Sequence, residues 1–415
     1  MKKKLRILLA WILVALVFQL GGYSLLNNQL QKVMGPSGVD REPPITPQLK
    51  ATIPGSDLTN IQVSYAKDYL AYSENATLKI FNLKKGNVVF EKKSPSSTDK
   101  TLGGLTYQWL PDRNILLYFY AKKNPNEVTT VKVYPPKLKM SPTVEPQAED
   151  PIHPKIVPKE VPVEPRLEKR YGSPQITELY SLELPNSDED TKPEDSLNTF
   201  DPPSGGEKIS EGGKIEQFIV ATSTNLMYLT VKKGSTQLLM KIDVMKEVST
   251  LNKPGELIDN MATSDRYGTL YFDSIVGTNH QVIALEGTNR RIISDNFDDR
   301  ILGISKGKVY IGQVENNQLV NIKTTTDLIK LTNNPSLKTE WEGSIPFNDD
   351  VRWLIGAKGQ IVIYDHKTAN IITAGKLAEV KLQGDENYVS VDGAELIQLT
   401  KQGSSTLVEL HPLKP

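Results

Sequence analysis

Cysteine is absent from this chain of 415 residues, and histidine occurs only four times. Without cysteine there can be no disulfide framework, no thiolate zinc site, no cysteine nucleophile and no lipid-modified cysteine. The histidines share no spacing that would place two of them on one face of a helix or strand, so a histidine-based metal site is not expected. They are His153, His280, His366 and His411.

The chain also has no excess of one charge sign, because 49 basic residues balance 49 acidic ones. Residues 1–30 contain four basic residues and no acidic residue, which leaves 45 basic and 49 acidic residues for the rest of the chain. Such a mildly acidic body argues against nucleic-acid binding, which usually requires a basic patch. Length alone favours two or three domains of about 150 residues each.

The first 26 residues indicate where the protein resides. Residues 1–6 form a basic cap, and residues 7–26 (ILLAWILVALVFQLGGYSLL) carry no charge. As a helix rising about 1.5 Å per residue, this segment would be about 30 Å long, the thickness of a bilayer's hydrocarbon core. Because a basic flank stays in the cytoplasm, we predict a signal anchor. It would be a single transmembrane helix in the cell membrane, with the bulk of the chain extracytoplasmic.

The alternative to an anchor is a cleaved signal peptide. Its apolar core would be Ile7–Leu20, and Gly22–Ser24 is the best small-x-small cleavage site. Both interpretations export the body of the protein. Residues 27–56 contain five prolines, which fix φ and remove backbone donors, so this segment is predicted to be a flexible stalk.

Short apolar runs recur along the rest of the chain at a nearly constant interval. The steps between their central residues are 46, 110, 43, 39, 43 and 36. Five of the six are close to the length of one four-stranded propeller blade, about 40–45 residues. Seven markers therefore predict an all-β fold, a seven-bladed β-propeller over residues 57–412, with two packed sheets as the rival architecture. The markers are Tyr72, Tyr118, Tyr228, Tyr271, Tyr310, Trp353 and Val389.

The step of 110 residues indicates an insertion, and residues 135–213 differ in composition from the rest. Their first half has proline at every third to sixth residue and should form a polyproline-like arm. Asn186–Gly213 is acidic, rich in Pro, Gly and Ser, and predicted to be disordered. Between them, Gln175–Leu184 is assigned as an outer strand of the second blade, although it would belong to an eighth blade if one exists. Circular closure is expected to involve Leu58–Val63 and Thr406–Leu410.

One segment carries a resemblance to a known family. Trp109–Tyr118 (WLPDRNILLY) resembles the blade signature W-S-P-D-G-x-x-[LI]-x-[YF] of the bacterial TolB-like and WD40-like propellers, with Leu110 in place of Ser and Arg113 in place of Gly. The other repeats lack the W-x-P-D run. The resemblance implies blades arranged around a central channel, and it implies no activity, because propellers serve both as enzymes and as scaffolds.

Catalytic motifs are scarce. Gly303–Gly307 reads G-x-S-x-G, but the nucleophile elbow needs a helix after the turn, whereas a strand follows here, so Ser305 is predicted to lie in a hairpin turn. The acidic clusters at residues 188–190, 295–299 and 348–350 do not match calcium-loop spacing. We therefore predict no catalytic, cofactor-binding or metal-ligating residues and no cofactor. The sequence favours a binding protein over an enzyme.

Three functions remain open. The leading hypothesis is a membrane-anchored extracytoplasmic propeller that binds another envelope or membrane protein, or a cell-envelope polymer, with the proline arm either as a second contact element or as a tolerated loop. The second is an enzyme acting on envelope glycans or small lactone-like molecules at the channel mouth, for which His280 and His366 are the residues to inspect. The third is an extracytoplasmic ligand sensor.

Overall fold

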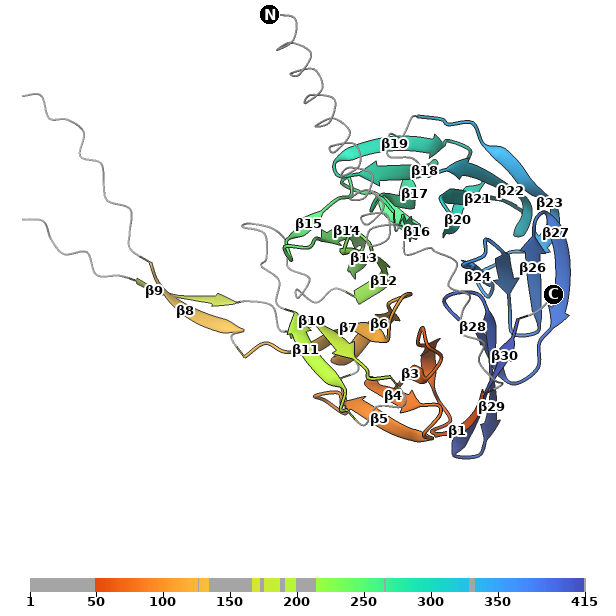
Figure 1. The fold of residues 1–415 in the computed structure, drawn as a ribbon. Coiled ribbons are helices and arrows are strands. Elements are labelled where there is room, and N and C mark those ends of the chain that lie inside the picture. The colour runs from red at the N-terminus through yellow and green to blue at the C-terminus, as the bar shows by residue number, and fades with distance from the viewer. Residues whose placement is uncertain are drawn as a thin grey trace, which may run out of the picture.

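The computed structural model describes residues 49–99, 101–125, 127–133, 166–171, 175–186, 191–198, 214–264, 266–327 and 333–413. They contain 30 strands, of which 28 form seven four-stranded antiparallel sheets. The sheets stand around a common centre as the blades of a propeller (Figure 1), which confirms the predicted all-β, seven-bladed fold. No helix within these ranges is long and apolar enough to cross a membrane, and the predicted anchor at residues 7–26 lies outside them.

Each blade is numbered in chain order, and its first strand lies nearest the centre of the ring. The strands, from the centre outward, are: blade 1, β2 (Thr59–Val63), β3 (Tyr69–Glu74), β4 (Thr77–Asn82) and β5 (Asn87–Lys92); blade 2, β6 (Gly103–Trp109), β7 (Ile115–Lys123), β10 (Gln175–Glu183) and β11 (Glu194–Asn198); blade 3, β12 (Lys214–Ala221), β13 (Leu226–Lys233), β14 (Thr236–Ile242) and β15 (Val248–Thr250); blade 4, β16 (Leu257–Thr263), β17 (Leu270–Val276), β18 (Asn279–Glu286) and β19 (Asn289–Ser294); blade 5, β20 (Asp299–Ser305), β21 (Lys308–Glu315), β22 (Gln318–Thr326) and β23 (Lys338–Pro346); blade 6, β24 (Arg352–Ile355), β25 (Ile361–Tyr364), β26 (Thr368–Thr373) and β27 (Lys376–Lys381); and blade 7, β28 (Glu386–Val389), β29 (Glu395–Gln402), β30 (Ser405–Pro412) and β1 (Leu49–Pro54).

The first five apolar runs seen in the sequence lie in the second strands of blades 1 to 5, which are covered on both faces by neighbouring blades. In β3, Tyr69 and Ala71 pack toward blade 2, whereas Leu70 and Tyr72 pack toward blade 7. Successive side chains of a strand point to opposite faces, so a strand covered on both sides needs apolar residues throughout. This packing explains why the runs are continuous rather than alternating.

A six-residue turn recurs between the first and second strands of several blades. Ser64, Ser264 and Ser390 each close it with their backbone N–H, which donates to the carbonyl oxygen five residues later, at distances of 2.8–2.9 Å. The serine hydroxyl also accepts a backbone N–H from within the turn. In blade 2, Leu110 makes the same backbone bond to Ile115, which places the Trp109–Tyr118 signature at the equivalent turn.

The ring closes through a strand from the amino-terminal side of the propeller. β1 pairs with β30 along its full length, so blade 7 takes its outermost strand from residues 49–54. Lys67 of blade 1, only 2% exposed, adds ion pairs to Asp392 (2.8 Å) and Glu395 (3.0 Å) of blade 7. Closure by β1 therefore packs blade 1 against blade 7, although the two blades lie at opposite ends of the chain.

This closure corrects two expectations. Residues 49–54 were expected to be the end of a flexible stalk, but Ile53 is fully buried against blade 7 and the segment is a strand. The stretch Leu58–Val63, expected to close the ring, contains β2, the innermost strand of blade 1. This stretch is not the closing strand, but its apolar residues pack in one cluster with residues of blade 7. The expected partner Thr406–Leu410 takes part in closure as β30.

The interval of about 40 residues gave the correct number of blades but not a constant position within them. The first five markers lie in the second strands of blades 1 to 5, whereas Trp353 and Val389 lie in the first strands of blades 6 and 7. The second strand of blade 6 is the four-residue β25. In blades 6 and 7 the short first strands contain the aromatic or valine residue that served as the marker. The marker of these two blades therefore lies one strand closer to the centre than in blades 1 to 5.

Blade 2 is interrupted between its second and third strands. β7 pairs directly with β10, with Lys123 opposite Gln175, so the predicted strand at 175–184 does belong to this blade, as its third strand. Between them, β8 (Val128–Val133) and β9 (Arg166–Tyr171) form a two-stranded ribbon that projects away from the ring (Figure 1). The predicted proline arm falls largely on residues 134–165, which lie outside the described ranges.

The outermost strand of blade 2 lies in a segment expected to be disordered. β11 (Glu194–Asn198) falls within the acidic stretch Asn186–Gly213, yet it pairs with β10. Asp195 accepts hydrogen bonds from Tyr118 (2.7 Å) and from Lys92 of blade 1 (2.8 Å). These partners come from distant parts of the chain, so composition alone could not indicate that the acidic residue stabilises a strand.

Candidate binding pocket

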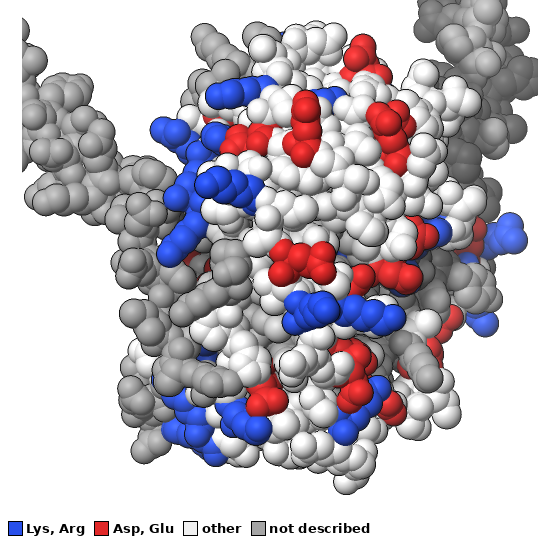
Figure 2. All heavy atoms as spheres, turned by 90° about the vertical axis from the view of Figure 1, so that its right-hand side faces the viewer, with Lys and Arg blue, Asp and Glu red and all other residues white. Residues whose placement is uncertain are grey.

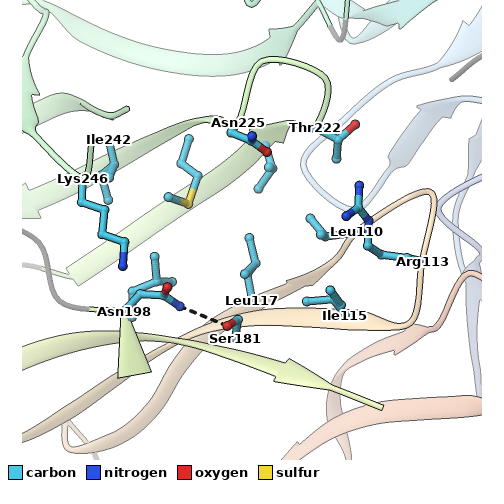
Figure 3. A pocket seen from close by; sticks show the side chains of 13 residues that line it. Leu110, Arg113, Ile115, Leu117, Ser181, Asn198, Thr222, Asn225, Ile242 and Lys246 are labelled. Atoms are coloured by element: carbon cyan, nitrogen blue, oxygen red, sulfur yellow. Dashed lines mark hydrogen bonds between the residues drawn. The ribbon is translucent and has the colours of Figure 1, made fainter. Parts of the chain in front are cut away.

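A pocket of about 230 Å³ lies between blades 2 and 3. Its lining includes residues of the loops that join first to second strands and third to fourth strands. We call the face of the ring that carries these loops face A. Its apolar lining comes from both blades and includes Leu117, Leu179, Val220, Met227 and Ile242 (Figure 3). Its polar lining consists of Arg113, Ser181, Asn198, Thr222, Asn225 and Lys246.

The pocket is lined by aliphatic and polar side chains, without an aromatic ring among the described residues that line it. Between blades 1 and 2 the wedge is filled by large aromatic residues, among them Trp109 and Tyr118, which are almost fully buried. On the opposite side of the same strands, Leu117 pairs with Ser181. Serine leaves space where an aromatic ring could stand, so the core between blades 2 and 3 remains open toward face A.

One hydrogen bond and one aromatic contact fix the residues around the pocket. The side-chain amide of Asn198, the last residue of β11, donates to the Ser181 hydroxyl at 3.2 Å. Deeper between the blades, Phe119 and Phe218 pack edge to face with ring centres 5.1 Å apart. The pocket is therefore an extension of a packed interface rather than a mobile surface cleft.

Lys246 is the cation at one end of the pocket. It lies in the turn between β14 and β15, where the Asp243 carboxylate accepts the backbone N–H groups of Met245 (2.9 Å) and Glu247 (3.0 Å). Lys246 itself adopts a φ of 64°, and no acidic partner for its ammonium group exists among the described residues. The turn thus presents to the pocket a positive charge that is unpaired within the described part of the chain (Figure 3).

Arg113 lies at the other end of the pocket, in the turn within the blade signature (Figure 3). Its guanidinium group donates two hydrogen bonds to Asp112, at 3.0 and 2.7 Å. This bond raises the pKa of Arg113, and the Asp112 carboxylate offsets its charge. None of the described residues that line the pocket is acidic, and of its two cations Lys246 is the one without an acidic partner among the described residues.

The charge elsewhere on the ring is mixed. On the side formed by β23, β27 and β30, acidic and basic side chains are interspersed (Figure 2). Exposed ion pairs contribute to this pattern, including Lys308 with Glu340 at 3.3 Å. The lining of the pocket, which includes Arg113 and Lys246 and no acidic residue among those described, differs in this respect from that mixed surface.

The residues singled out by the sequence do not come together. Ser305 ends β20, and the hairpin residues Lys306 and Gly307 lead directly into β21, as predicted; its hydroxyl donates to the Gly356 carbonyl at 3.0 Å. His366 lies in the turn between β25 and β26, where its carbonyl accepts from Asn387. His280 lies on β18 of blade 4, so the two histidines belong to different blades.

His280 is part of a buried polar group between blades 4 and 5. It is 4% exposed, and its Nδ1 lies 2.9 Å from a guanidinium nitrogen of Arg300. Because arginine can only donate, Nδ1 accepts and Nε2 carries the proton. Nε2 has no partner among the described residues. Burial, together with the Arg300 charge, lowers the pKa of His280 to about 4.

Asp273 belongs to the same junction, although no sequence motif singled it out. Its fully buried carboxyl group accepts hydrogen bonds from the Ile301 backbone N–H (2.8 Å) and the Asn260 side chain (3.0 Å). Burial raises its pKa to about 8. Asp273 thus joins blade 4 to the first strand of blade 5, and this position in the core gives it a structural role.

Sequence reasoning also missed Lys246 and the pocket. The chain offers one local signal, because the turn Asp243–Glu247 contains Val244 and Met245, which are 58% and 76% exposed. Two apolar residues in a turn after an alternating strand are unusual, since turns normally carry polar residues. The opposite wall comes from blade 2, and no spacing in the sequence could place it there.

Comparisons with known proteins concern the fold. No protein-family model and no curated protein matches the chain. Among solved structures it is similar to the Dos1 propeller (12% identity, TM-score 0.44), over 85% of this chain and 78% of that one. It is also similar to the Cps50 (Swd1) β-propeller domain of Myceliophteria thermophila (10% identity, TM-score 0.45), over 88% of this chain and 99% of that one.

A third similar structure belongs to a study of two prolyl endopeptidases, with 14% identity and a TM-score of 0.45. That similarity covers 87% of this chain but 47% of the other. The seven four-stranded sheets form the propeller architecture that the resemblance to WD40-like and TolB-like propellers implied. At these identities a likeness describes architecture, and function must be argued from the site itself.

Proposed function

We propose that this protein is a membrane-anchored, extracytoplasmic propeller that binds another envelope or membrane protein, or a cell-envelope polymer. The observation that carries the binding function is the open pocket on face A, with its apolar lining and polar rim. Apolar cavities with a few placed polar groups are the usual form of a binding site. The uncharged segment at residues 7–26 after a basic cap supports the anchor.

The location is tested by fractionation of bacterial cells that express the full-length chain. We expect the protein to sediment with membranes and to resist extraction by alkaline carbonate, because a transmembrane helix is held by the hydrophobic effect rather than by charge. Protease added outside the cytoplasmic membrane should digest the body. Recovery of the intact chain in the soluble cytoplasmic fraction would contradict the anchor.

The binding function is tested by crosslinking in intact cells followed by affinity capture of the full-length chain. The matched control carries residues 1–48 of this protein fused to an unrelated folded domain, which removes partners that recognise only the amino-terminal segment. We expect a defined partner to be captured by the full chain and not by the control. An identical set of crosslinked species in both would contradict a binding role for the propeller.

A further inference from the structure

The size of the pocket limits what it can hold. Its volume of about 230 Å³ is below the range of about 300–1,000 Å³ that is typical of sites for drug-sized ligands. An apolar cavity of this size accepts one large side chain and part of its backbone. The lining by Leu117, Val220 and Met227 favours an aliphatic or aromatic group in that position.

The charge at the rim adds a second requirement. Lys246 presents an ammonium group without an acidic partner among the described residues, and Arg113 is already paired with Asp112. A ligand that leaves Lys246 unpaired would gain nothing from it, whereas a carboxylate would form a charge-assisted hydrogen bond. The occupant should therefore carry a negative charge close to its apolar group.

Exposed side chains beside the pocket indicate that the occupant is larger than the pocket. Val244 and Met245 precede Lys246 in the same hydrogen-bonded turn and remain largely exposed. Exposed apolar side chains at the edge of a cavity commonly mark a protein-binding surface, and methionine adapts to different partners. A partner chain that enters the pocket could cover both residues, but a small molecule could not.

We propose that the pocket binds a short segment of a partner protein in which one large apolar side chain is followed by an acidic residue. The apolar side chain would enter between blades 2 and 3, and the carboxylate would pair with Lys246. This inference rests on the proposed binding function and names the chemistry of the partner. It assigns the contact to a junction between two blades on face A.

The test uses the full-length chain and unlabelled peptides of defined sequence. The probe is Gly-Ser-Phe-Asp-Ser-Gly, and two counterparts replace its Asp by Lys or its Phe by Ala. Calorimetric titration, supported by saturation-transfer NMR, measures the three affinities. We expect the Phe-Asp peptide to bind about tenfold more tightly than either counterpart, with a preference that weakens as salt increases. Equal affinities for the three peptides would overturn the proposal.

A charge exchange at the rim separates the proposed contact from a general effect of folding. Lys246→Glu should reverse the preference, so that the Phe-Lys peptide binds more tightly than the Phe-Asp peptide. Lys358→Glu is the matched control, because Lys358 is exposed on face A in a turn of blade 6. It should leave the preference unchanged. An unaltered preference in Lys246→Glu, or a reversal in Lys358→Glu, would overturn the assignment.

Filling the pocket gives an independent measurement. Ser181→Leu adds volume at the floor and should abolish binding of the Phe-Asp peptide without changing the far-UV circular dichroism spectrum. Retained binding in a folded Ser181→Leu variant would contradict entry of the side chain. The alternative occupant is the segment of residues 200–212 of the same chain. If the Phe-Asp peptide bound only after this segment was replaced by Gly-Ser repeats, the segment itself would be the occupant, and the proposal of a partner would be overturned.

Failure of this inference and failure of the proposed function give different results. If the crosslinked partner is captured equally by the wild type and by Lys246→Glu, the propeller binds its partner elsewhere and only the pocket assignment is wrong. If no partner is captured while the peptides bind with the expected preference, the binding chemistry stands and the cellular role is wrong.

Discussion

At the scale of single residues, Asp273 is expected to make stability depend on pH. Its buried carboxyl group has a pKa raised from 3.8 to about 8. The folded chain therefore keeps a proton that the unfolded chain releases above about pH 4, so this group stabilises the fold most at low pH. Its contribution is lost as the pH rises through the window between the two pKa values. His280, with its pKa lowered from 6.5 to about 4, has the opposite effect.

Asp273→Asn isolates this contribution, because the amide does not titrate and His280 is present in both proteins. We expect the free energy of unfolding of the variant, relative to wild type, to rise between about pH 4 and pH 8, by up to about 1.4 kcal/mol per pH unit. Urea denaturation at several pH values in this range measures the difference. A difference that does not change with pH would show that Asp273 ionises normally.

Two residues of the blade signature join blade 2 to blade 1. Trp109 is 1% exposed and donates from its indole N–H to the Gln62 carbonyl of blade 1, at 3.2 Å. Asn114 accepts the Ala66 backbone N–H of the same blade, at 3.2 Å. These two contacts join blade 2 to blade 1. The sequence correctly placed the signature in a blade, but the contacts that it makes became visible only in the folded ring.

At the scale of elements, the insertion in blade 2 is expected to be separable from the propeller. Among the described strands, β8 and β9 pair only with each other, while β7 and β10 already pair at Lys123 and Gln175. A tight Asn-Gly turn can connect strands that meet in this way. Replacing residues 124–174 by Asn-Gly should therefore leave the blade intact.

Thermal denaturation checks this expectation. We expect the melting temperature of the shortened chain to stay within about 3 °C of the full-length protein, because a change of about 1 kcal/mol corresponds to about 2–4 °C in a large domain. Loss of cooperative unfolding would show that the insertion supports the ring. The same variant also tests the arm, since an unchanged crosslinked partner would count against its role as a contact element.

At the scale of the whole molecule, stability depends on ring closure by β1. A fragment of residues 57–415 lacks this strand, whereas a fragment of residues 45–415 retains it. Removing β1 exposes the backbone of β30 and leaves the space of the fully buried Ile53 empty. Loss of one buried isoleucine alone costs about 2–5 kcal/mol.

We therefore expect the fragment of residues 57–415 to melt about 10 °C below the fragment of residues 45–415. Both should show β-type circular dichroism, and differential scanning calorimetry measures the two melting temperatures. A peptide of residues 45–56, added in excess, should restore part of the difference because it binds only the folded ring. Equal melting temperatures without the peptide would contradict a closing role for β1.

The sequence by itself determined the all-β class, the seven blades and the position of the insertion, because these features follow from local patterns. Apolar runs at an interval of about 40 residues mark blades whatever their partners. Tertiary structure alone decided that residues 49–54 close the ring, that the acidic segment around Asp195 forms a strand and that a pocket opens beside Lys246. Each depends on residues far apart in the chain, as when Lys92 and Tyr118 hold Asp195. Contacts of that kind leave no periodic trace in the sequence.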